Sequence, residues 1–260
     1  MLQRINQFYL VSDYKNILTE INGLTYPFDP NWSNIAIALS GGADSTLLGY
    51  ILSDFISKND LKIKIHFIHN IRCWKTKPWQ KYIFDQIVIW FQKKFNNIDF
   101  KVHYNFVPPD LEHSNTGKTI LDEYGKLVSG DTIELRAYAE YICNQHNIDA
   151  YFNGITKNPN VSIQDEIESR NIDITEENFR LAVMPHMNFL ACHPFRFVDK
   201  SWIINTYEYL NLSDLLKITR SCEGQFSDIN YSNYVYGQYV PLCNNCFWCK
   251  ERDWGIKNAK

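Results

Sequence analysis

The residues best placed for chemistry form a short loop, Ser40-Gly41-Gly42-Ala43-Asp44-Ser45, between an apolar run and a segment of helical pattern. Two adjacent glycines permit a tight turn and allow a ligand to approach the backbone closely. The free N–H groups and the positive dipole end of the following helix attract anions, phosphates above all. The loop therefore predicts a phosphate-binding turn, and a purely structural strand–turn–helix junction is the alternative.

Two common nucleotide-binding patterns are excluded. A Walker loop requires Gly, four residues, and then Gly-Lys-Ser/Thr, but residues 40–45 contain no lysine. The run Gly117-Lys118-Thr119 matches the second half of that pattern, but the first glycine would fall on Glu112. The dinucleotide pattern G-x-G-x-x-G also fails, because the two glycines of the loop are adjacent.

A second group of chemically active residues lies near the end of the chain. Three of the seven cysteines have C-x-x-C-x-x-C spacing, and a fourth lies upstream of them: Cys222, Cys243, Cys246 and Cys249. Close C-x-x-C pairs and one remote cysteine can bind a single ion tetrahedrally, and zinc suits four thiolates. An iron–sulfur cluster is the alternative metal group, and burial as small apolar side chains is the alternative without metal.

Other reactive side chains receive structural interpretations. We expect His186 and His193 to make structural hydrogen bonds rather than to bind a ligand or transfer protons. Cys73, Cys143 and Cys192 are isolated in the sequence and are expected to be buried apolar side chains.

Strands and helices alternate along the chain. Apolar patterns predict strands over 35–39, 62–68, 100–106, 150–155 and 194–198, and helices over 44–56, 79–95, 131–146 and 199–210. This alternation predicts an α/β fold, a doubly wound parallel sheet with helices on both faces. Such sheets bind ligands beyond the carboxyl ends of their strands. His69 and Gly154, which end the second and fourth strands, should therefore join the loop in one pocket.

The domain organisation follows from these elements. Residues 1–33 are expected to be a helical extension packed on the outside, 34–218 the nucleotide-binding domain, and 219–260 a small zinc-binding segment. The connection over 108–130 has few periodic apolar positions. A connection of this length is typical of a functional or mobile segment.

Composition limits the classes of function. The chain has 260 residues and a formal charge of −3, so it shows no strong nucleic-acid signal. We find no apolar stretch of membrane-spanning length and no signal-peptide core at the start. An odd number of cysteines argues against a disulfide framework. A reducing cytoplasm is the expected location.

The order of motifs now matches a known family. The string S-G-G-x-D-S resembles the phosphate loop of the N-type ATP pyrophosphatases, the PP-loop superfamily with the adenine nucleotide alpha hydrolase-like fold. These enzymes cleave ATP between its α and β phosphates. The chain looks like their 7-cyano-7-deazaguanine synthases. The resemblance rests on the segment 40–46, on Pro194-Phe195 with Lys200 and the helix after it, and on the segment 216–222 with the three later cysteines and Arg252.

The resemblance implies a set of site residues. The ATP contacts would be Leu39, Ser40, Gly41, Gly42, Ala43, Asp44, Ser45 and Thr46 in and around the loop, while His69 and Gly154 join this set because they end neighbouring strands. Of these, Asp44 would contact Mg²⁺ and Ser45 a phosphate oxygen, while Arg136 would neutralise the α phosphate; these three are the candidate catalytic residues. A helix cap for Asp44 and a surface or ion-paired role for Arg136 are the alternatives. The four clustered cysteines would bind Zn²⁺.

The implied reaction is the ATP-dependent conversion of 7-carboxy-7-deazaguanine and ammonia to the nitrile 7-cyano-7-deazaguanine (preQ0). The family often forms homodimers. The chain departs from the family in the segments that face the substrate, 68–72 and 154–159, and Arg136 is followed by Ala137 rather than Asn. The alternatives are a divergent PP-loop enzyme acting on another substrate, in nucleic-acid modification or antiviral defence, a tRNA sulfur-transferase, and a non-catalytic nucleotide-binding subunit.

Overall fold

The structure is a computed structural model. It describes the backbone of residues 2–5, 8–11, 19–21, 24–26, 28–72, 78–107, 119–121, 127–157, 181–183, 189–224, 229 and 232–260. Side chains are described for 28–72, 78–107, 133–157, 189–224, 229 and 232–260.

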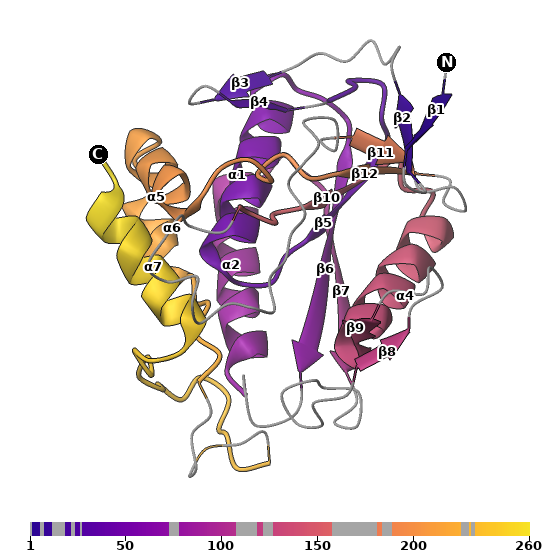
Figure 1. Ribbon diagram of the computed structural model, residues 1–260. Helices are drawn as coiled ribbons and strands as arrows, with labels where there is room; N and C mark the ends of the chain where they lie inside the picture. Colours follow the sequence, from indigo (N-terminus) through magenta and orange to yellow (C-terminus); the bar gives the residue numbers. More distant parts are fainter. Residues whose placement is uncertain are drawn as a thin grey trace.

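An eight-stranded sheet forms the centre of the molecule (Figure 1), in the order β1-β2-β11-β12-β10-β5-β6-β7. Its parallel part consists of β5 (Asn34–Ala38), β6 (Lys64–Arg72), β7 (Phe100–Val107), β10 (Ala150–Asn153) and β12 (Leu190–Cys192). The chain builds this part outward from β5 in one direction to β7, and then from β10 to β12 in the other. The strand order therefore reverses between β5 and β10, as in a doubly wound sheet, and the predicted α/β fold class is confirmed.

Helices cover both faces of the sheet (Figure 1). On one face lie α1 (Ala43–Lys58) and α2 (Gln80–Lys94), followed by α5 (Lys200–Tyr209) and α6 (Ser213–Ile218); on the other lies α4 (Gly130–Gln145). The strands pack against the helices on both faces of the sheet, because successive side chains along a strand point to opposite faces. Ile37 and Phe67 pack under α1 and α2, while Ala36 and Ile68 pack under α4.

The C-terminal helix α7 (Phe247–Asn258) lies along α5 on the outside of the molecule (Figure 1). Arg252 of α7 donates to the carbonyl oxygens of Thr219 and Leu216 over 2.9 Å each. These carbonyls end α6, where a cationic donor satisfies otherwise unpaired acceptors. Arg252 thus fixes the path of the chain just before Cys222.

The helical prediction for the N-terminal extension is wrong. The backbone forms β1 (Leu2–Ile5), β2 (Phe8–Val11), β3 (Thr19–Ile21) and β4 (Leu24–Tyr26). The run Phe8-Tyr9-Leu10-Val11 consists of residues that favour strands. It pairs with β11 (Leu181–Val183) through Tyr9 and Val183, and so extends the central sheet instead of packing outside it.

The predicted strand over 194–198 is also misplaced. The strand is β12, a buried run that ends at Cys192. Residues 194–197 form turns in which the backbone N–H of Arg196 donates to the carbonyl oxygen of His193 over 3.3 Å. A proline cannot donate to a strand ladder, so Pro194 ends the strand. Within the connection over 108–130, β8 (Thr119–Leu121) and β9 (Leu127–Ser129) form a hairpin, and the rest lies outside the described residues.

In the part of the chain that the structure describes, none of the helices has the length and apolar character needed to cross a membrane.

Candidate functional site

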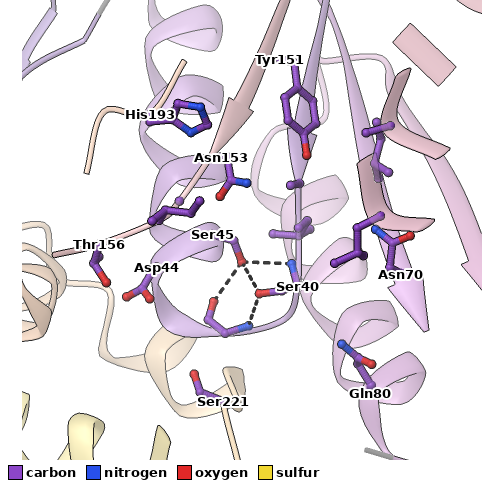
Figure 2. A pocket seen from close by; sticks show the side chains of 18 of the residues that line it. Ser40, Asp44, Ser45, Asn70, Gln80, Tyr151, Asn153, Thr156, His193 and Ser221 are labelled. Atoms are coloured by element: carbon purple, nitrogen blue, oxygen red, sulfur yellow. Dashed lines mark hydrogen bonds between the residues drawn. The ribbon is translucent and has the colours of Figure 1, made fainter. Parts of the chain in front are cut away.

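A cavity of about 810 Å³ opens at the carboxyl ends of the parallel strands, where the strand order reverses between β5 and β10 (Figure 2). Its walls come from the loop after β5, from the ends of β6, β10 and β12, from one side of α4, and from residues 220–223. This volume is typical of small-molecule sites, and the position is the one at which doubly wound sheets bind ligands.

The loop after β5 has the conformation of an anion-binding turn. Gly41 has φ +84°, a left-handed conformation that favours glycine. The Ser45 hydroxyl accepts from the Ser40 N–H over 3.1 Å and lies 3.0 Å from the Ser40 hydroxyl (Figure 2). Gly42 is the N-cap of α1, and within the described residues no side chain caps this helix. The start of α1 therefore presents N–H groups and a positive dipole end beside the cavity.

Gly154 has a structural reason to be glycine. A Cβ at this position would lie 2.9 Å from both the N and the Cα of Ser45. The end of β10 therefore passes directly against the first turn of α1, which brings the two halves of the sheet together at the cavity. Gly154 lines the cavity through this close contact.

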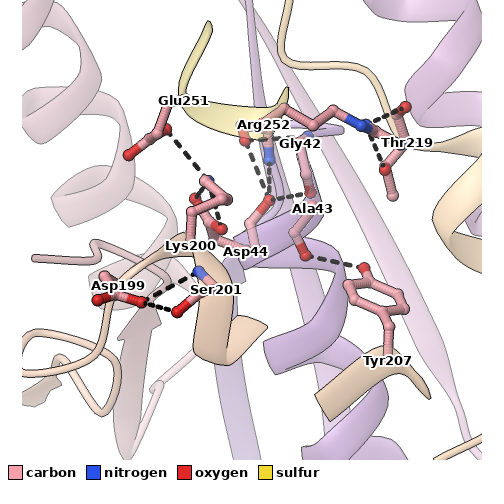
Figure 3. Close-up of polar contacts among 12 residues, drawn as sticks. Gly42, Ala43, Asp44, Asp199, Lys200, Ser201, Tyr207, Thr219, Glu251 and Arg252 are labelled. Carbon is pink, nitrogen blue, oxygen red and sulfur yellow. Dashed lines mark hydrogen bonds and ion pairs between the residues drawn. The ribbon is translucent and has the colours of Figure 1, made fainter. Parts of the chain in front are cut away.

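Asp44 has a partner that the sequence did not reveal (Figure 3). The ammonium of Lys200 donates to Oδ1 and Oδ2 of Asp44 over 2.6 and 2.5 Å. Lys200 is 2% exposed and also lies 3.3 Å from the buried carboxylate of Glu251 in α7. The structure thus places a buried ammonium directly beside the Asp44 carboxylate. The helix-cap alternative is wrong, because the N-cap is Gly42.

Lys200 is held in place by the start of its own helix. Asp199 caps α5, and its Oδ1 accepts from the N–H groups of Ser201 and Trp202 over 3.0 and 3.3 Å (Figure 3). This cap fixes the first turn of α5, which corresponds to the helix predicted over 199–210, and with it the backbone of Lys200. The sequence thus indicated the helix start but not the residue that Lys200 contacts.

The charge in the cavity favours anions. Its lining includes Arg72, Arg136, Arg196 and Arg220 against the acidic residues Asp44, Glu140 and Glu223. Lys200 neutralises Asp44, and Arg72 lies 3.3 Å from Glu223. Cationic groups therefore predominate, an arrangement that attracts a polyanion.

The structure brings most of the predicted site residues together. Leu39, Ser40, Gly42, Asp44, Ser45, Arg136 and Gly154 line the cavity. Three other residues of the predicted set are buried and lie outside its lining: Gly41, Ala43 and Thr46. They shape the turn and the helix from behind.

His69 lies outside the cavity lining. His69 is fully buried, its Nδ1 lies 2.8 Å from the carbonyl oxygen of Leu39, and its ring stacks on Phe84 with centroids 4.1 Å apart. Side chains alternate along β6, so Asn70 and Arg72 reach the cavity while His69 faces α2. The neighbour of His69 on β6 that lines the cavity is Asn70, one position further along the strand.

His193 was missed as a cavity residue. It follows β12 and lines the cavity (Figure 2), and its enclosed Nδ1 has no hydrogen-bond partner among the described residues. Burial and the nearby Arg196 lower the pKa of His193 to about 4, so its imidazole is neutral at pH 7. A strand predicted to end at 192 rather than 198 would have placed His193 at a carboxyl end. His186 lies outside the described residues.

The four clustered cysteines converge as predicted. The Sγ atoms of Cys222, Cys243, Cys246 and Cys249 all lie within 4.8 Å of one another. Cys222 Sγ is 3.5 Å from Cys243 Sγ, which is 3.9 Å from Cys249 Sγ. Four thiolates around one zinc ion at Zn–S distances of about 2.3 Å are about 3.8 Å apart. The donor set and its spacing therefore fit a single tetrahedral ion.

Backbone N–H groups surround these sulfurs. Glu223 N–H donates to Cys246 Sγ over 3.4 Å, and Cys246 N–H donates to Cys243 Sγ over 3.3 Å. Hydrogen bonds, chiefly with Cys246, lower the pKa of Cys222 to about 4. A four-iron cluster binds one thiolate at each iron and so requires ligands farther apart than a single ion does. The compact spacing favours zinc. Cys143 and Cys192 are buried away from this site, and Cys73 lies outside the described residues.

The cysteine segment is attached directly to the phosphate loop. Arg220 N–H donates to the carbonyl of Gly41 over 2.9 Å, and the Arg220 guanidinium lies 4.1 Å from the ring centroid of Trp79. The same guanidinium donates to the carbonyl oxygens of Val240 and Pro241. The cysteine segment thus shapes one wall of the cavity.

Comparison with known proteins shows similarity to solved structures alone. The sequence matches no protein-family model and no curated protein. Among solved structures, it is similar to the U34-tRNA thiolase NcsA from Methanococcus maripaludis, which carries a 4Fe–4S cluster, with 16% identity and a TM-score of 0.41 over 70% of this chain and 57% of the thiolase. The chain thus spans little more than half of the thiolase's length.

A second similar structure is phosphoadenylyl-sulfate (PAPS) reductase from Candida auris in complex with phosphate. The identity is 12% and the TM-score 0.39, over 75% of this chain and 83% of the reductase. At these levels, neither similarity assigns a substrate or cofactor to the present chain.

Proposed function

We propose that this protein is a PP-loop ATP pyrophosphatase that activates a carboxylate by adenylation and transfers it to ammonia. The observation that carries the proposal is the uncapped start of α1 beside a cavity in whose charged lining arginines outnumber carboxylates. That arrangement suits the triphosphate of ATP, and it lies where the strand order of the sheet reverses. The intact S-G-G-x-D-S string supports catalysis over simple nucleotide binding.

The chemistry follows from the leaving groups. A carboxylate oxygen attacks the α phosphorus of ATP, the bond to the bridging oxygen breaks, and pyrophosphate leaves. Ammonia then attacks the acyl carbon, and AMP leaves with the former carboxylate oxygen. Loss of the amide oxygen and two protons, formally as water, gives the nitrile. Backbone N–H groups at 41–45 would stabilise the charge that develops on pyrophosphate, and Arg136 would neutralise the α phosphate.

The cofactors belong to the same proposal. Mg²⁺ would arrive with the ATP phosphates, as is usual for this ion. Asp44, whose carboxylate is paired with Lys200, would orient the first turn of α1. Cys222, Cys243, Cys246 and Cys249 would hold a structural Zn²⁺ that fixes the wall formed by residues 220–223.

We propose 7-carboxy-7-deazaguanine, or a related deazaguanine carboxylic acid, as the acceptor and 7-cyano-7-deazaguanine as the product. This rests on the sequence resemblance of the phosphate loop, the Lys200 segment and the cysteine segment. A homodimer and a cytoplasmic location are part of the same proposal. The neutral imidazole of His193 lies in the cavity and is available to a heterocyclic substrate as donor or acceptor.

The test is incubation of the protein with ATP, Mg²⁺ and ammonia, with and without the carboxydeazaguanine. We expect pyrophosphate and AMP to form, and mass spectrometry to detect the nitrile only when the acid is present. Gly42→Asp should abolish pyrophosphate release, because a Cβ at this position would lie 2.9 Å from the Ser221 hydroxyl and the added charge repels phosphate. Pyrophosphate release by this variant at the wild-type rate would refute the assigned role of the loop.

Other outcomes would identify the alternatives. Pyrophosphate release without nitrile would leave a PP-loop enzyme with another acceptor, as in nucleic-acid modification or antiviral defence. ATP binding without turnover would indicate a non-catalytic subunit. A brown protein containing iron and acid-labile sulfide would instead favour a sulfur-transferase.

A further inference from the structure

Three histidines meet at the amino ends of the parallel strands, the end opposite the cavity. They come from three elements: His66 near the start of β6, His103 in β7, and His146 just after the last residue of α4. Their nearest ring nitrogens all lie within 4.8 Å of one another. Arg136, in the amino-terminal half of α4, lines the cavity. The three histidines lie at the carboxyl end of the same helix.

Sheet geometry explains why the side chains meet. In the parallel pairing of β6 and β7, Ile68 is opposite His103 and His66 is opposite Lys101. His66 and His103 are therefore diagonal neighbours on one face of the sheet, the face that α4 covers. Asn147 has φ +50° and ends the helix there, which brings His146 over the two strand histidines.

The distances suit a shared ion. His66 Nδ1 and His103 Nε2 lie 3.0 Å apart, and the centroid of the His146 ring is 4.9 Å from that of His66 and 4.8 Å from that of His103. Imidazole nitrogens bound to one zinc ion at about 2.0–2.1 Å are about 3.3 Å apart in a tetrahedron. A slight increase in the distance between His66 Nδ1 and His103 Nε2, together with rotation of the half-buried His146 side chain, would let all three rings bind one ion.

The second nitrogen of His66 has the partner that a metal ligand requires. His66 Nε2 lies 3.4 Å from Oδ1 of Asn34, an acceptor that places the ring hydrogen on Nε2 and leaves the lone pair on Nδ1, toward His103. Metal-bound histidines usually donate their other N–H in this way.

We propose that His66, His103 and His146 form a second metal site, which takes Zn²⁺ or another divalent ion of the first transition row that prefers imidazole. Water completes the coordination, because His103 and His146 are only half-buried and β7 is the edge strand of the sheet. The carboxyl end of α4 favours a cation at this position. The ion would join the edge strand to α4, a structural role independent of the proposed reaction.

The test is metal stoichiometry on the full chain. Protein stripped of metal and reloaded with Zn²⁺ is analysed by native mass spectrometry, and we expect two zinc ions per chain. His103→Gln and His146→Gln should each retain one, held by the cysteines. His193→Gln is the matched control, because this histidine lies outside the cluster, and it should retain two.

X-ray absorption of the doubly loaded wild-type protein provides a readout that does not depend on variants. We expect sulfur ligands together with the outer-shell scattering of imidazole rings, and a higher melting temperature than that of the protein with one zinc ion. One zinc ion per wild-type chain, or sulfur scattering alone, would overturn the proposal. A second ion that persists in both His103→Gln and His146→Gln would overturn it as well.

Discussion

Asp44 in the phosphate loop and Lys200 at the start of α5 are 156 residues apart in sequence, and their side chains make two hydrogen bonds of 2.6 and 2.5 Å. Lys200 is buried and also lies 3.3 Å from Glu251 in α7. One ammonium thus joins the starts of α1 and α5 to the C-terminal helix (Figure 3). The position of the phosphate loop depends on elements far from it in sequence.

Lys200→Met should strongly destabilise the protein. The substitution leaves the buried carboxylate of Glu251 without the ammonium that offsets its charge, which typically costs about 3–5 kcal/mol. The measurement is the free energy of unfolding from urea titration. Lys58→Met is the matched control, because its pair with Asp54 is 72% exposed on the lysine side and should contribute less than about 1 kcal/mol. Equal effects of the two substitutions would contradict this account.

Asp44→Asn separates the structural role of Asp44 from magnesium binding. We expect it to lower the free energy of unfolding, because Lys200 loses the carboxylate that both its short hydrogen bonds reach. The Mg²⁺ concentration for half-maximal pyrophosphate release should stay within about twofold of wild type. A tenfold or larger rise in that concentration, with unchanged stability, would instead assign Asp44 to the metal.

Gly154→Ala should damage both stability and nucleotide binding. The new Cβ would lie 2.9 Å from backbone atoms of Ser45, which cannot move without shifting the start of α1. We expect a loss of about 1–3 kcal/mol in the free energy of unfolding, as for overpacked sites, and at least tenfold weaker ATP binding by calorimetry.

Gly49→Ala is the control for this substitution. It lies in α1, and its added Cβ would come 3.1 Å from the tip of the Phe91 ring, a side chain that can shift. ATP affinity should remain near that of wild type. Wild-type ATP affinity in Gly154→Ala would show that the contact between β10 and α1 does not set the geometry of the loop.

Cys243→Ser should remove the metal from the cysteine site. Cys243 Sγ lies between Cys222 Sγ and Cys249 Sγ, at 3.5 and 3.9 Å, so its loss opens the tetrahedron. We expect one zinc ion fewer per chain by elemental analysis, together with a lower melting temperature. Cys192→Ser, a fully buried cysteine in β12, should lower stability without changing metal content. Unchanged zinc in Cys243→Ser would rule out this ligand set.

His193 should make stability depend on pH in the acid range. Its pKa in the folded protein is about 4, below the ordinary value of about 6.5, so between these values the unfolded chain binds more protons. The free energy of unfolding should therefore rise between pH 4 and 6.5 and level off above 6.5. For a half-buried ring we expect about 2 kcal/mol. His193→Gln should lose this part of the slope in urea titrations at pH 4.5 and 7, and an unchanged slope would contradict the shifted pKa.

Local patterns in the sequence predicted four of the five parallel strands, the main helices and the convergence of the clustered cysteines. A run such as Ile35-Ala36-Ile37 indicates a buried strand, the adjacent glycines indicate a tight turn, and Asp199 indicates a helix start, because each depends on neighbours within a few residues. The spacing of Cys243, Cys246 and Cys249 predicted convergence for the same reason, since a short loop alone brings these sulfurs together.

Only the tertiary structure decided which side chains face the cavity. A shift of one residue along β6 exchanges His69 for Asn70, because alternate side chains point to opposite faces. His193 lies in the cavity because β12 ends at Cys192, just before it. The N-terminal segment extends the sheet because β2 pairs with β11. The pairing of Asp44 with Lys200 depends on the packing of α5 against α1. Contacts of this kind join residues far apart in the chain, so no local pattern records them.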